Sequence, residues 1–233
     1  STAAFRTVRT RRQVTLVVVE VIRLRISEIF FSLQGETRTV GLPTTFVRLT
    51  GCPLRCHYCD TSYAFSGGDW MTLDEVVTQV KANSAKHVTV TGGEPLAQPS
   101  CIPLLTALCQ LGYEVSLETS GAIDIAAVDK RVMKVMDLKT PASGESDKNL
   151  WSNLKYLTTN DQIKFVICNE SDYEWCKAQI LEHKLEQLCE VLLSPSQDEL
   201  SPTVLADWIL RDQLNVRFQL QLHKVLWGDE AGR

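Results

Sequence analysis

Three cysteines within a short loop constrain this chain more than any other feature. Cys52, Cys56 and Cys59 are spaced C-x-x-x-C-x-x-C. Three thiolates at such close spacing can hold three irons of a cubane iron–sulfur cluster, which leaves the fourth iron without a protein ligand. Because an iron without a protein ligand can bind a small molecule, this spacing favours a cluster that takes part in chemistry over one that only carries electrons.

The same cysteines allow two other interpretations. A structural zinc site would need a fourth ligand, and the nearby His57 has little freedom to turn onto the same metal. Disulfides are disfavoured because the group is odd in number and the chain does not look secreted. We therefore prefer the iron–sulfur cluster and keep the zinc site and the disulfide as alternatives.

Length and composition indicate one ordinary globular domain. The chain has 233 residues, of which 44% are hydrophobic and 22% are charged, and this length suits one full-sized domain. The net charge of −4 gives no general nucleic-acid footprint, and no apolar run approaches the roughly 20 residues that span a bilayer. The other cysteines stand singly in apolar segments, which favours buried side chains in a cytoplasmic protein: Cys101, Cys109, Cys168, Cys176 and Cys189.

The first 22 residues differ from the rest. Four arginines lie in a stretch without acids before residue 13, and a mostly apolar run over residues 14–21 follows. A basic start before an apolar run is typical of targeting sequences, but no small-residue cleavage site follows here. We interpret residues 1–22 as a poorly ordered extension and residues 23–233 as the core domain.

Strand and helix patterns alternate along the core domain. The expected strands cover residues 25–31, 44–49, 87–91, 113–118, 132–138, 163–168, 190–193 and 216–222. The expected helices cover residues 102–110, 123–130, 172–185 and 201–214, and another begins at a capping box of Thr72 and Glu75. This alternation predicts a parallel α/β sheet or barrel with its polar motifs at the carboxyl ends of the strands, where barrel enzymes place their active sites. Residues 143–149 are the best candidate for a mobile loop.

Two motifs at strand ends carry candidate ligand contacts. Arg48 ends an apolar strand that leads into the cysteine loop, and a guanidinium there can pair with an anion in a two-pronged geometry. Gly92-Gly93-Glu94-Pro95 ends another strand, where two glycines let a ligand approach the backbone closely. Downstream of a three-cysteine loop, this stretch resembles the motif with which radical S-adenosylmethionine (SAM) enzymes contact the methionyl amino group.

Further motifs narrow the resemblance to one family. The chain has Ser32-Leu33-Gln34-Gly35-Glu36 before the strand that ends in Arg48, and it has Gly51-Cys52-Pro53 and Cys59-Asp60-Thr61 at the two ends of the cysteine loop. Together with Glu118-Thr119-Ser120-Gly121 and Gln221-Leu222-His223-Lys224, these stretches resemble the 7-carboxy-7-deazaguanine synthases from about Leu24 to the C-terminus. The resemblance implies an incomplete (β/α)6-type radical SAM barrel.

The resemblance also implies a reaction. Such an enzyme is a carbon–nitrogen lyase that converts 6-carboxy-5,6,7,8-tetrahydropterin to 7-carboxy-7-deazaguanine with loss of ammonia, on the way to queuosine in tRNA. Its cofactors are a [4Fe–4S] cluster, SAM and Mg²⁺, and a 5′-deoxyadenosyl radical removes the C6 hydrogen of the pterin. A homodimer and an external one-electron donor, flavodoxin or ferredoxin, are implied as well.

Carried over residue by residue, the resemblance implies a role for each motif. The cluster ligands are Cys52, Cys56 and Cys59. The SAM contacts are Tyr58, Asp60, Gly93, Glu94, Ser120, Asp137, Leu138 and Lys139, although only the lysine of the family's Ser-Pro-Lys segment is kept at residues 137–139. The substrate contacts are Leu33, Gln34, Gly35, Glu36, Arg48 and Thr91. Thr61 would place its hydroxyl oxygen on Mg²⁺, a hard cation that prefers oxygen ligands, whereas His223 is interpreted as a satisfied histidine at a strand end.

Two other functions stay open at this point. A glycyl-radical-enzyme activase also carries a three-cysteine loop and a Gly-Gly-Glu stretch, but it lacks the Ser-Leu-Gln-Gly-Glu stretch joined to Cys-Asp-Thr and acts on a protein backbone. A non-catalytic iron–sulfur electron-transfer module would bind no SAM and would leave Gly92-Gly93-Glu94 unexplained.

Overall fold

A nine-stranded mixed sheet forms the centre of the fold. The computed structural model describes residues 3–10, 13–228, 230 and 232, and its larger sheet has the order β11-β10-β9-β8-β7-β6-β4-β3-β5. The strands are β3 (Arg23–Leu33), β4 (Pro43–Leu49), β5 (Asp69–Thr72), β6 (His87–Gly92), β7 (Glu114–Thr119), β8 (Met133–Asp137), β9 (Gln162–Ile167), β10 (Glu190–Pro195) and β11 (Arg217–Phe218). Neighbours from β4 to β11 run parallel, whereas β3 is antiparallel to β4 and β5.

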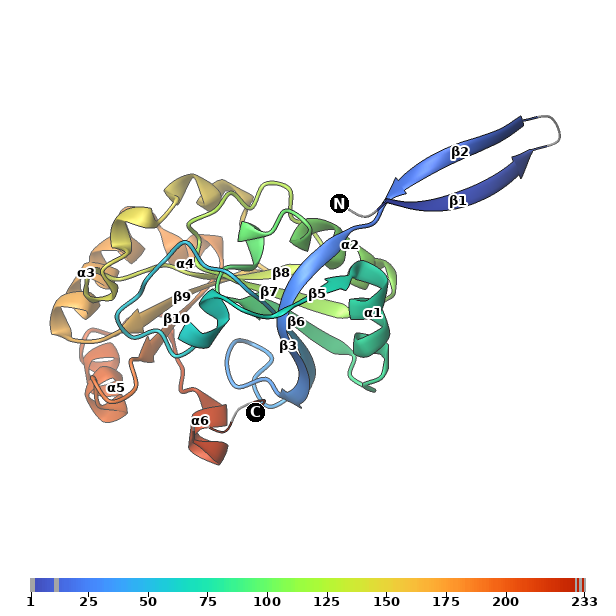
Figure 1. The fold of residues 1–233 in the computed structure, drawn as a ribbon. Coiled ribbons are helices and arrows are strands. Elements are labelled where there is room, and N and C mark those ends of the chain that lie inside the picture. The colour runs from blue at the N-terminus through green and yellow to red at the C-terminus, as the bar shows by residue number, and fades with distance from the viewer. Residues whose placement is uncertain (1–2, 11–12, 229, 231, 233) are drawn as a thin grey trace.

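The parallel strands from β4 to β10 confirm the expected incomplete (β/α)6-type barrel (Figure 1). The strand order begins at β11 and ends at β5, so within the described residues the sheet does not close on itself. The helices are α1 (Leu73–Lys81), α2 (Cys101–Gln110), α3 (Glu170–Glu182), α4 (Leu185–Leu188), α5 (Pro202–Arg211) and α6 (Leu222–Trp227). Among the described residues, none of these helices has the length and apolar character needed to cross a membrane.

Helix α1 begins where the sequence predicts it, because both halves of the capping box form. The Thr72 hydroxyl accepts a hydrogen bond from the Glu75 backbone N–H at 3.2 Å, and the Glu75 carboxylate accepts one from the Thr72 N–H at 2.7 Å. Val76 and Val80 on its inner face are fully buried in the core. The cap therefore fixes where the helix starts, and the valines fix which face it turns to the sheet.

Two expected elements are wrong, each for a local reason. Residues 123–130 form turns rather than a helix, because Asp124 and Asp129 accept hydrogen bonds from backbone N–H groups two residues further on, at 2.9 Å each. Of residues 216–222, only Arg217–Phe218 pair as a strand with β10. The Leu222 N–H donates instead to the Gly35 carbonyl at 2.8 Å and begins α6.

The core lies between the parallel strands and the helices. Its fully buried side chains include Val47, Val90, Leu117, Met136, Ile163 and Phe165 from the strands and Leu104, Leu105, Leu108, Tyr173 and Leu205 from the helices. The five cysteines outside the loop are buried and free, which confirms the prediction made from their apolar surroundings. Burial on this scale holds the strands rigidly and leaves their carboxyl ends to carry polar groups.

The N-terminal segment forms a separate hairpin. Strands β1 (Ala3–Thr10) and β2 (Gln13–Glu20) pair antiparallel with each other and with no strand of the larger sheet. Figure 1 shows this hairpin projecting away from the rest of the protein. The domain boundary at residue 22 and the poor order expected of residues 1–22 stay predictions.

Candidate active site

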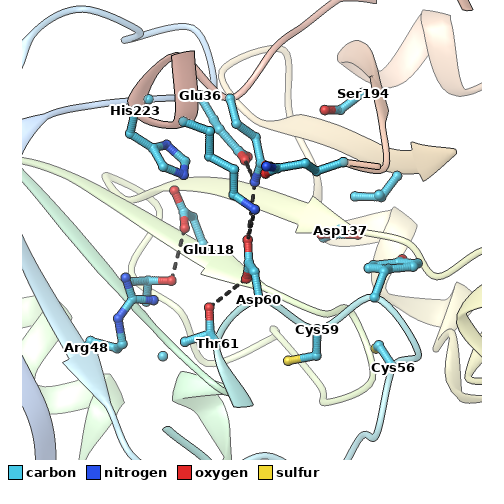
Figure 2. Close-up of a pocket in the computed structure, with 18 of the residues that line it drawn as sticks. Glu36, Arg48, Cys56, Cys59, Asp60, Thr61, Glu118, Asp137, Ser194 and His223 are labelled. Atoms are coloured by element: carbon cyan, nitrogen blue, oxygen red, sulfur yellow. Dashed lines mark hydrogen bonds and ion pairs between the residues drawn. The ribbon is translucent and has the colours of Figure 1, made fainter. Parts of the chain in front are cut away.

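A large cavity lies at the carboxyl ends of the parallel strands. It has a volume of about 720 Å³ and is lined from the β3–β4 loop, the cysteine loop, the ends of β6, β7, β8, β9 and β10, and α6. Figure 2 shows Glu36, Glu118 and His223 toward one end and Cys56 and Cys59 toward the other. The cavity gathers most of the predicted site residues: Leu33, Gln34, Gly35, Glu36, Arg48, Cys52, Cys56, Tyr58, Cys59, Asp60, Thr61, Thr91, Gly93, Ser120, Asp137 and Lys139.

The cysteine loop is held against the Gly-Gly motif by backbone contacts. The Gly51 carbonyl accepts the Glu94 N–H at 2.8 Å, and Gly51 itself has a φ of +102° that favours glycine. A Cβ on Gly93 would come within 2.5 Å of the Gly51 carbonyl oxygen and 2.6 Å of the Cys52 Cβ. The two motifs therefore need glycine in order to approach each other this closely.

The donor set of the loop suits an iron–sulfur cluster. All three cysteines are free, half-buried and line the cavity. Burial raises the pKa of Cys52, and it raises the pKa of Cys56 to about 11, so these thiols need a nearby cation in order to ionise. His57 turns outward, with its Nε2 3.3 Å from Glu199, and so does not join them as a fourth ligand. Within the described residues, no group of three or more His, Cys, Asp and Glu side chains is arranged to hold a single metal ion.

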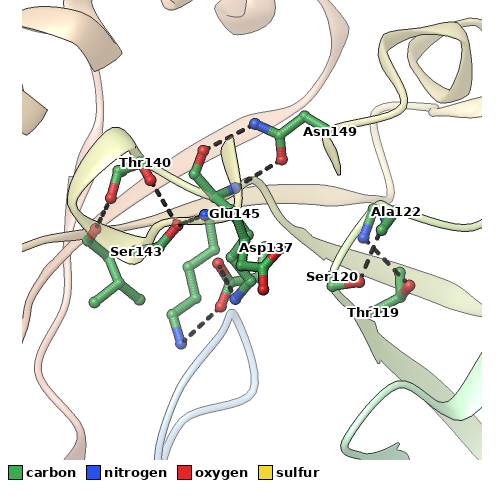
Figure 3. Close-up of polar contacts among 12 residues, drawn as sticks. Thr119, Ser120, Ala122, Asp137, Thr140, Ser143, Glu145 and Asn149 are labelled. Atoms are coloured by element: carbon green, nitrogen blue, oxygen red, sulfur yellow. Dashed lines mark hydrogen bonds and ion pairs between the residues drawn. The ribbon is translucent and has the colours of Figure 1, made fainter. Parts of the chain in front are cut away.

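The loop between β8 and β9 supports the cysteine loop from outside. The Ser143 carbonyl accepts the His57 N–H at 3.0 Å, and the Glu145 carboxylate accepts the Arg55 N–H at 2.5 Å. Asn149 closes the base of this loop with two hydrogen bonds to the Lys139 backbone, each 2.8 Å (Figure 3). The mobility expected of residues 143–149 stays a prediction, although both ends of the loop are anchored.

Two of the predicted SAM contacts lie beneath the cavity rather than on its wall. Glu94 is fully buried and accepts hydrogen bonds from the Ser120 N–H at 2.7 Å, from the Ser120 hydroxyl at 2.6 Å and from the Thr119 hydroxyl at 2.9 Å. Leu138 is fully buried in the apolar core. The Glu94 side chain therefore braces the end of β7 and holds Ser120, which does line the cavity.

Tyr58 offers an unused polar atom at the cluster end. Its hydroxyl is buried and has no hydrogen-bond partner among the described residues. The Lys139 Nζ lies 5.8 Å from the centroid of its ring and 3.1 Å from Asp137 Oδ1. A buried hydroxyl without a protein partner costs free energy, so this end of the cavity suits a ligand with polar groups.

At the other end, hydrogen bonds join the predicted substrate residues to Glu118. The Gln34 Nε2 donates to Thr89 at 3.1 Å and to Glu118 at 3.4 Å, and the Thr91 hydroxyl donates to Glu118 at 2.9 Å. Burial and the neighbouring Glu36 raise the pKa of Glu118. This end thus combines amide, hydroxyl and carboxyl groups that can match a heterocycle with both donors and acceptors.

Arg48 is only partly engaged by the protein. Its Nε donates to Glu28 at 2.6 Å, and its guanidinium carbon lies 5.8 Å from the ring centroids of both Phe30 and Tyr63. Its two terminal nitrogens make no hydrogen bond within the described part of the chain. Because Arg48 lines the cavity, these nitrogens can receive a carboxylate in the geometry that the sequence predicts.

Sequence reasoning missed Lys164, which lies between the apolar residues Ile163 and Phe165 of β9. It is 8% exposed, lines the cavity, and forms an ion pair with Glu36. Burial would raise the pKa of Glu36, but Lys164 outweighs burial and holds it below its usual value. The only signal in the sequence was a lysine within Ile163–Ile167, at a position that faces inward from β9.

The prediction for His223 is wrong about its setting. It lies in α6 rather than at a strand end, and it lines the cavity. Burial lowers its pKa. A Cβ on Gly35 would come within 2.1 Å of the His223 Nδ1, so glycine at position 35 is what lets α6 close against the β3–β4 loop.

Thr61 and Asp60 lie side by side between the two ends. The Thr61 hydroxyl donates to Asp60 Oδ1 at 2.7 Å, while Asp60 Oδ2 lies 3.4 Å from the Gln221 Nε2 and 3.6 Å from the Lys224 Nζ of α6. Burial opposes ionisation of Asp60, but the bond from Thr61 and the charge of Lys224 outweigh it and lower its pKa. The group supplies oxygen atoms, as a hard cation requires.

Comparison with known proteins places this arrangement in a family. The sequence profile of the Radical SAM superfamily matches residues 46–138. The 7-carboxy-7-deazaguanine synthase of Chlorobaculum tepidum is 45% identical over 212 residues, which cover 89% of this chain and 96% of the relative. The synthase of Koribacter versatilis is 42% identical over 223 residues, which cover 89% of this chain and 99% of the relative.

A solved structure shows the same fold. QueE from Escherichia coli matches with a TM-score of 0.72 at 22% identity, over 86% of this chain and 95% of that one. Its likeness extends over most of the barrel, well beyond residues 46–138. With the three cysteines and the predicted substrate residues gathered in one cavity, this chain belongs to the 7-carboxy-7-deazaguanine synthase family of radical SAM enzymes.

Proposed function

We propose that this protein converts 6-carboxy-5,6,7,8-tetrahydropterin to 7-carboxy-7-deazaguanine with loss of ammonia, as a carbon–nitrogen lyase of queuosine biosynthesis. The observation that carries the proposal is that the cysteine loop and the Ser-Leu-Gln-Gly-Glu segment line opposite ends of one cavity. Relatives that are 45% and 42% identical bear the name of this activity. When bound, the [4Fe–4S] cluster and SAM supply the 5′-deoxyadenosyl radical.

The residues of the chain then divide the work between binding and orientation. Arg48 pairs with the carboxylate of the pterin through its two terminal nitrogens, and Glu28 holds the guanidinium in place. Gln34 and Glu118 face the donor and acceptor edge of the ring. Tyr58 and Ser120 contact SAM at the cluster end of the cavity.

We propose that Thr61 would hold Mg²⁺ through its hydroxyl oxygen, and that the substrate carboxylate would supply further oxygen to the ion. Replacing Thr61 by Ala removes one oxygen ligand, so cluster content and SAM binding should be retained while the rate responds less to added Mg²⁺. Thr61→Ser keeps the hydroxyl and should keep the wild-type response. A Thr61→Ala enzyme with an unchanged Mg²⁺ response would remove this residue from the metal site.

The proposal includes a cytoplasmic homodimer that receives electrons from flavodoxin or ferredoxin. An external electron donor is required throughout the radical SAM superfamily, to which the chain belongs. Neither the identity of the donor nor the dimer is needed for the chemistry described above. Both can be tested separately, by reduction with each purified donor and by light scattering.

The decisive experiment is an anaerobic assay with the full chain. The protein is reconstituted with iron and sulfide, reduced, and supplied with SAM, Mg²⁺ and 6-carboxytetrahydropterin. Mass spectrometry should find 7-carboxy-7-deazaguanine and 5′-deoxyadenosine, and turnover without any partner protein excludes a glycyl-radical-enzyme activase. Deoxyadenosine without the deazapurine would move the enzyme to another substrate, and neither product from a protein with an intact cluster would favour an electron-transfer module.

A further inference from the structure

A line of alternating charges crosses the cavity from one end to the other. Glu36 pairs with Lys164, whose Nζ lies 4.0 Å from Asp137 Oδ2, and Asp137 Oδ1 lies 3.1 Å from the Lys139 Nζ. Lys139 in turn lies over the ring of Tyr58 in the cysteine loop. We call Glu36, Lys164, Asp137 and Lys139 the charge line. It joins the predicted substrate end of the cavity to the predicted SAM end.

Lys164 is the link between the two halves of the charge line. The register of β8 and β9 places Asp137 beside Lys164, so both side chains leave neighbouring parallel strands toward the same face. Glu36 arrives from the β3–β4 loop, more than a hundred residues away in sequence. Among the described residues, Lys164 alone has ion pairs with both the β3–β4 loop, through Glu36, and the end of β8, through Asp137.

Because Lys164 is buried, its charge strongly affects the ionisation of the carboxyl groups around it. Burial alone would lower the pKa of this lysine, but Glu36 and Asp137 outweigh it and raise the pKa, so the side chain stays an ammonium ion. In return, the ammonium keeps Glu36 ionised beside another, partly buried carboxyl group, Glu118. Without the cation, these carboxylates would repel one another at a site with little water to screen them.

A second buried lysine on the neighbouring strand provides a matched comparison. Lys134 of β8 is 4% exposed and pairs with Asp161 at 3.0 Å, at the opposite, amino-terminal end of the sheet. It does not line the cavity. The two lysines thus share residue type, burial and an acidic partner, and they differ in which end of the barrel they occupy.

We propose that Lys164 is a positioning residue that fixes the β3–β4 loop, which carries Glu36, to the SAM-binding end of β8. In this way it keeps the substrate hydrogen within reach of the adenosyl radical. Lys164 acts through Glu36 and Asp137 and takes no part in bond making or breaking. The inference rests on the proposed function, because it concerns how the two ends of that active site are held in register.

The test compares Lys164→Met, Lys164→Arg and Lys134→Met with the wild-type holoenzyme. Each reconstituted protein is assayed anaerobically for iron content, melting temperature, SAM cleavage and 7-carboxy-7-deazaguanine. The informative quantity is the amount of deazapurine formed for each 5′-deoxyadenosine, since a merely structural lysine would lower both products together. Methionine keeps the length of the side chain and removes its charge, whereas arginine keeps the charge.

We expect Lys164→Met to keep its cluster and to cleave SAM, but to form about tenfold less deazapurine for each deoxyadenosine and to have an about tenfold higher KM for the pterin, as expected when a charged hydrogen-bond partner is lost. We call the amount of deazapurine formed for each deoxyadenosine the coupling. Lys164→Arg should recover most of the wild-type coupling. Lys134→Met should lower the melting temperature and leave the coupling at the wild-type value.

A pH profile gives an independent readout. Glu36 is faced by Lys164 from β9, Glu118 from β7, Gln221 just before α6, His223 in α6, and Asp60 from the cysteine loop. In Lys164→Met only the cation is missing, so burial raises the pKa of Glu36 and the carboxyl group ionises only at higher pH. The coupling of Lys164→Met should therefore improve as pH rises, by more than any change in the wild type.

Each outcome decides between clear alternatives. If the wild type forms deazapurine and Lys164→Met forms as much deazapurine for each deoxyadenosine as the wild type does, the inference about Lys164 is wrong and the proposed function is retained. Equal losses of coupling in Lys164→Met and Lys134→Met would also overturn it, because the effect would then be general destabilisation. A wild-type protein that forms no deazapurine overturns the proposed function, and the inference falls with it.

Discussion

The two ends of the central sheet use the same kinds of side chain for different purposes. At the amino-terminal end of β8 and β9, Asp161 accepts hydrogen bonds from the Lys134 N–H at 2.8 Å, the Thr158 N–H at 2.7 Å and the Thr158 hydroxyl at 3.0 Å. It also forms an ion pair with the Lys134 Nζ at 3.0 Å. Every oxygen of this carboxylate is occupied by the protein itself. Such a closed cluster stabilises the strand ends and offers nothing to a ligand.

At the carboxyl-terminal end, the polar groups are only partly satisfied by the protein. The Tyr58 hydroxyl and the terminal nitrogens of Arg48 make no hydrogen bonds within the described residues, and the pKa of Glu118 is raised by burial and by Glu36. These groups cost stability in the free protein and can be satisfied by a ligand. The comparison teaches that an incompletely satisfied polar cluster, rather than buried charge as such, marks the active end of this barrel.

The largest expected difference between the ends concerns cysteine. Cys56→Ala removes one of three cluster ligands, so we expect loss of bound iron, of SAM cleavage and of product. Cys189 lies just before β10 at the amino-terminal end and is buried in the core. Cys189→Ala should keep iron and activity, at a cost of about 1 kcal/mol in stability. Iron analysis and the anaerobic assay check both, and an active Cys56→Ala enzyme would contradict the cluster assignment.

Asp161→Asn should give the next largest effect, on stability alone. The substitution leaves Lys134 buried without its counter-ion, which should cost about 3 kcal/mol. For a chain of this size, that corresponds to a fall on the order of 10 °C in melting temperature. Below the transition, KM for the pterin should stay at the wild-type value. A changed KM with unchanged stability would show that the amino-terminal end takes part in function.

Arg48→Ala should show the reverse pattern. Removing the guanidinium leaves the substrate carboxylate without its partner, so KM for the pterin should rise by roughly 10- to 100-fold with little change in cluster content. The matched control is Arg131→Ala before β8, since Arg131 is exposed and pairs with Asp129 on the surface at 2.6 Å. Exposed ion pairs contribute little to stability, so Arg131→Ala should change neither KM for the pterin nor cluster content. A near-normal KM in Arg48→Ala would remove Arg48 from the site.

The sequence predicted that the three cysteines meet but missed the contact between Lys164 and Glu36, and the reason is distance along the chain. Cys52, Cys56 and Cys59 lie in one loop after a strand, so their proximity follows from spacing alone. Lys164 contacts Glu36 only because β9 and the β3–β4 loop meet in three dimensions. The spacing of residues along the chain does not predict such a long-range contact, and neither does a lone lysine in a strand.

Local competition explains the errors in secondary structure. The strand and helix alternation was visible because apolar periodicity dominates most elements. It failed at residues 123–130, where two aspartates bind their own backbone, and at residues 216–222, where a contact with Gly35 starts a helix. The second error also misplaced His223, because α6 and not a strand carries it to the cavity.

The smallest expected effect separates two glutamates of one strand. Glu118 near the carboxyl end of β7 has a raised pKa, so its contribution to stability is fully present below the pKa of the unfolded chain and is lost as pH rises through the folded pKa. Glu118→Gln removes that loss and should stabilise the protein by about 1 kcal/mol at pH 8 and by less at pH 5. Glu114 begins the same strand, is exposed, and pairs with Lys86, which lowers its pKa. Glu114→Gln should change the melting temperature little at either pH, and a gain equal to that of Glu118→Gln would mean that the two ends of β7 do not differ as the comparison requires.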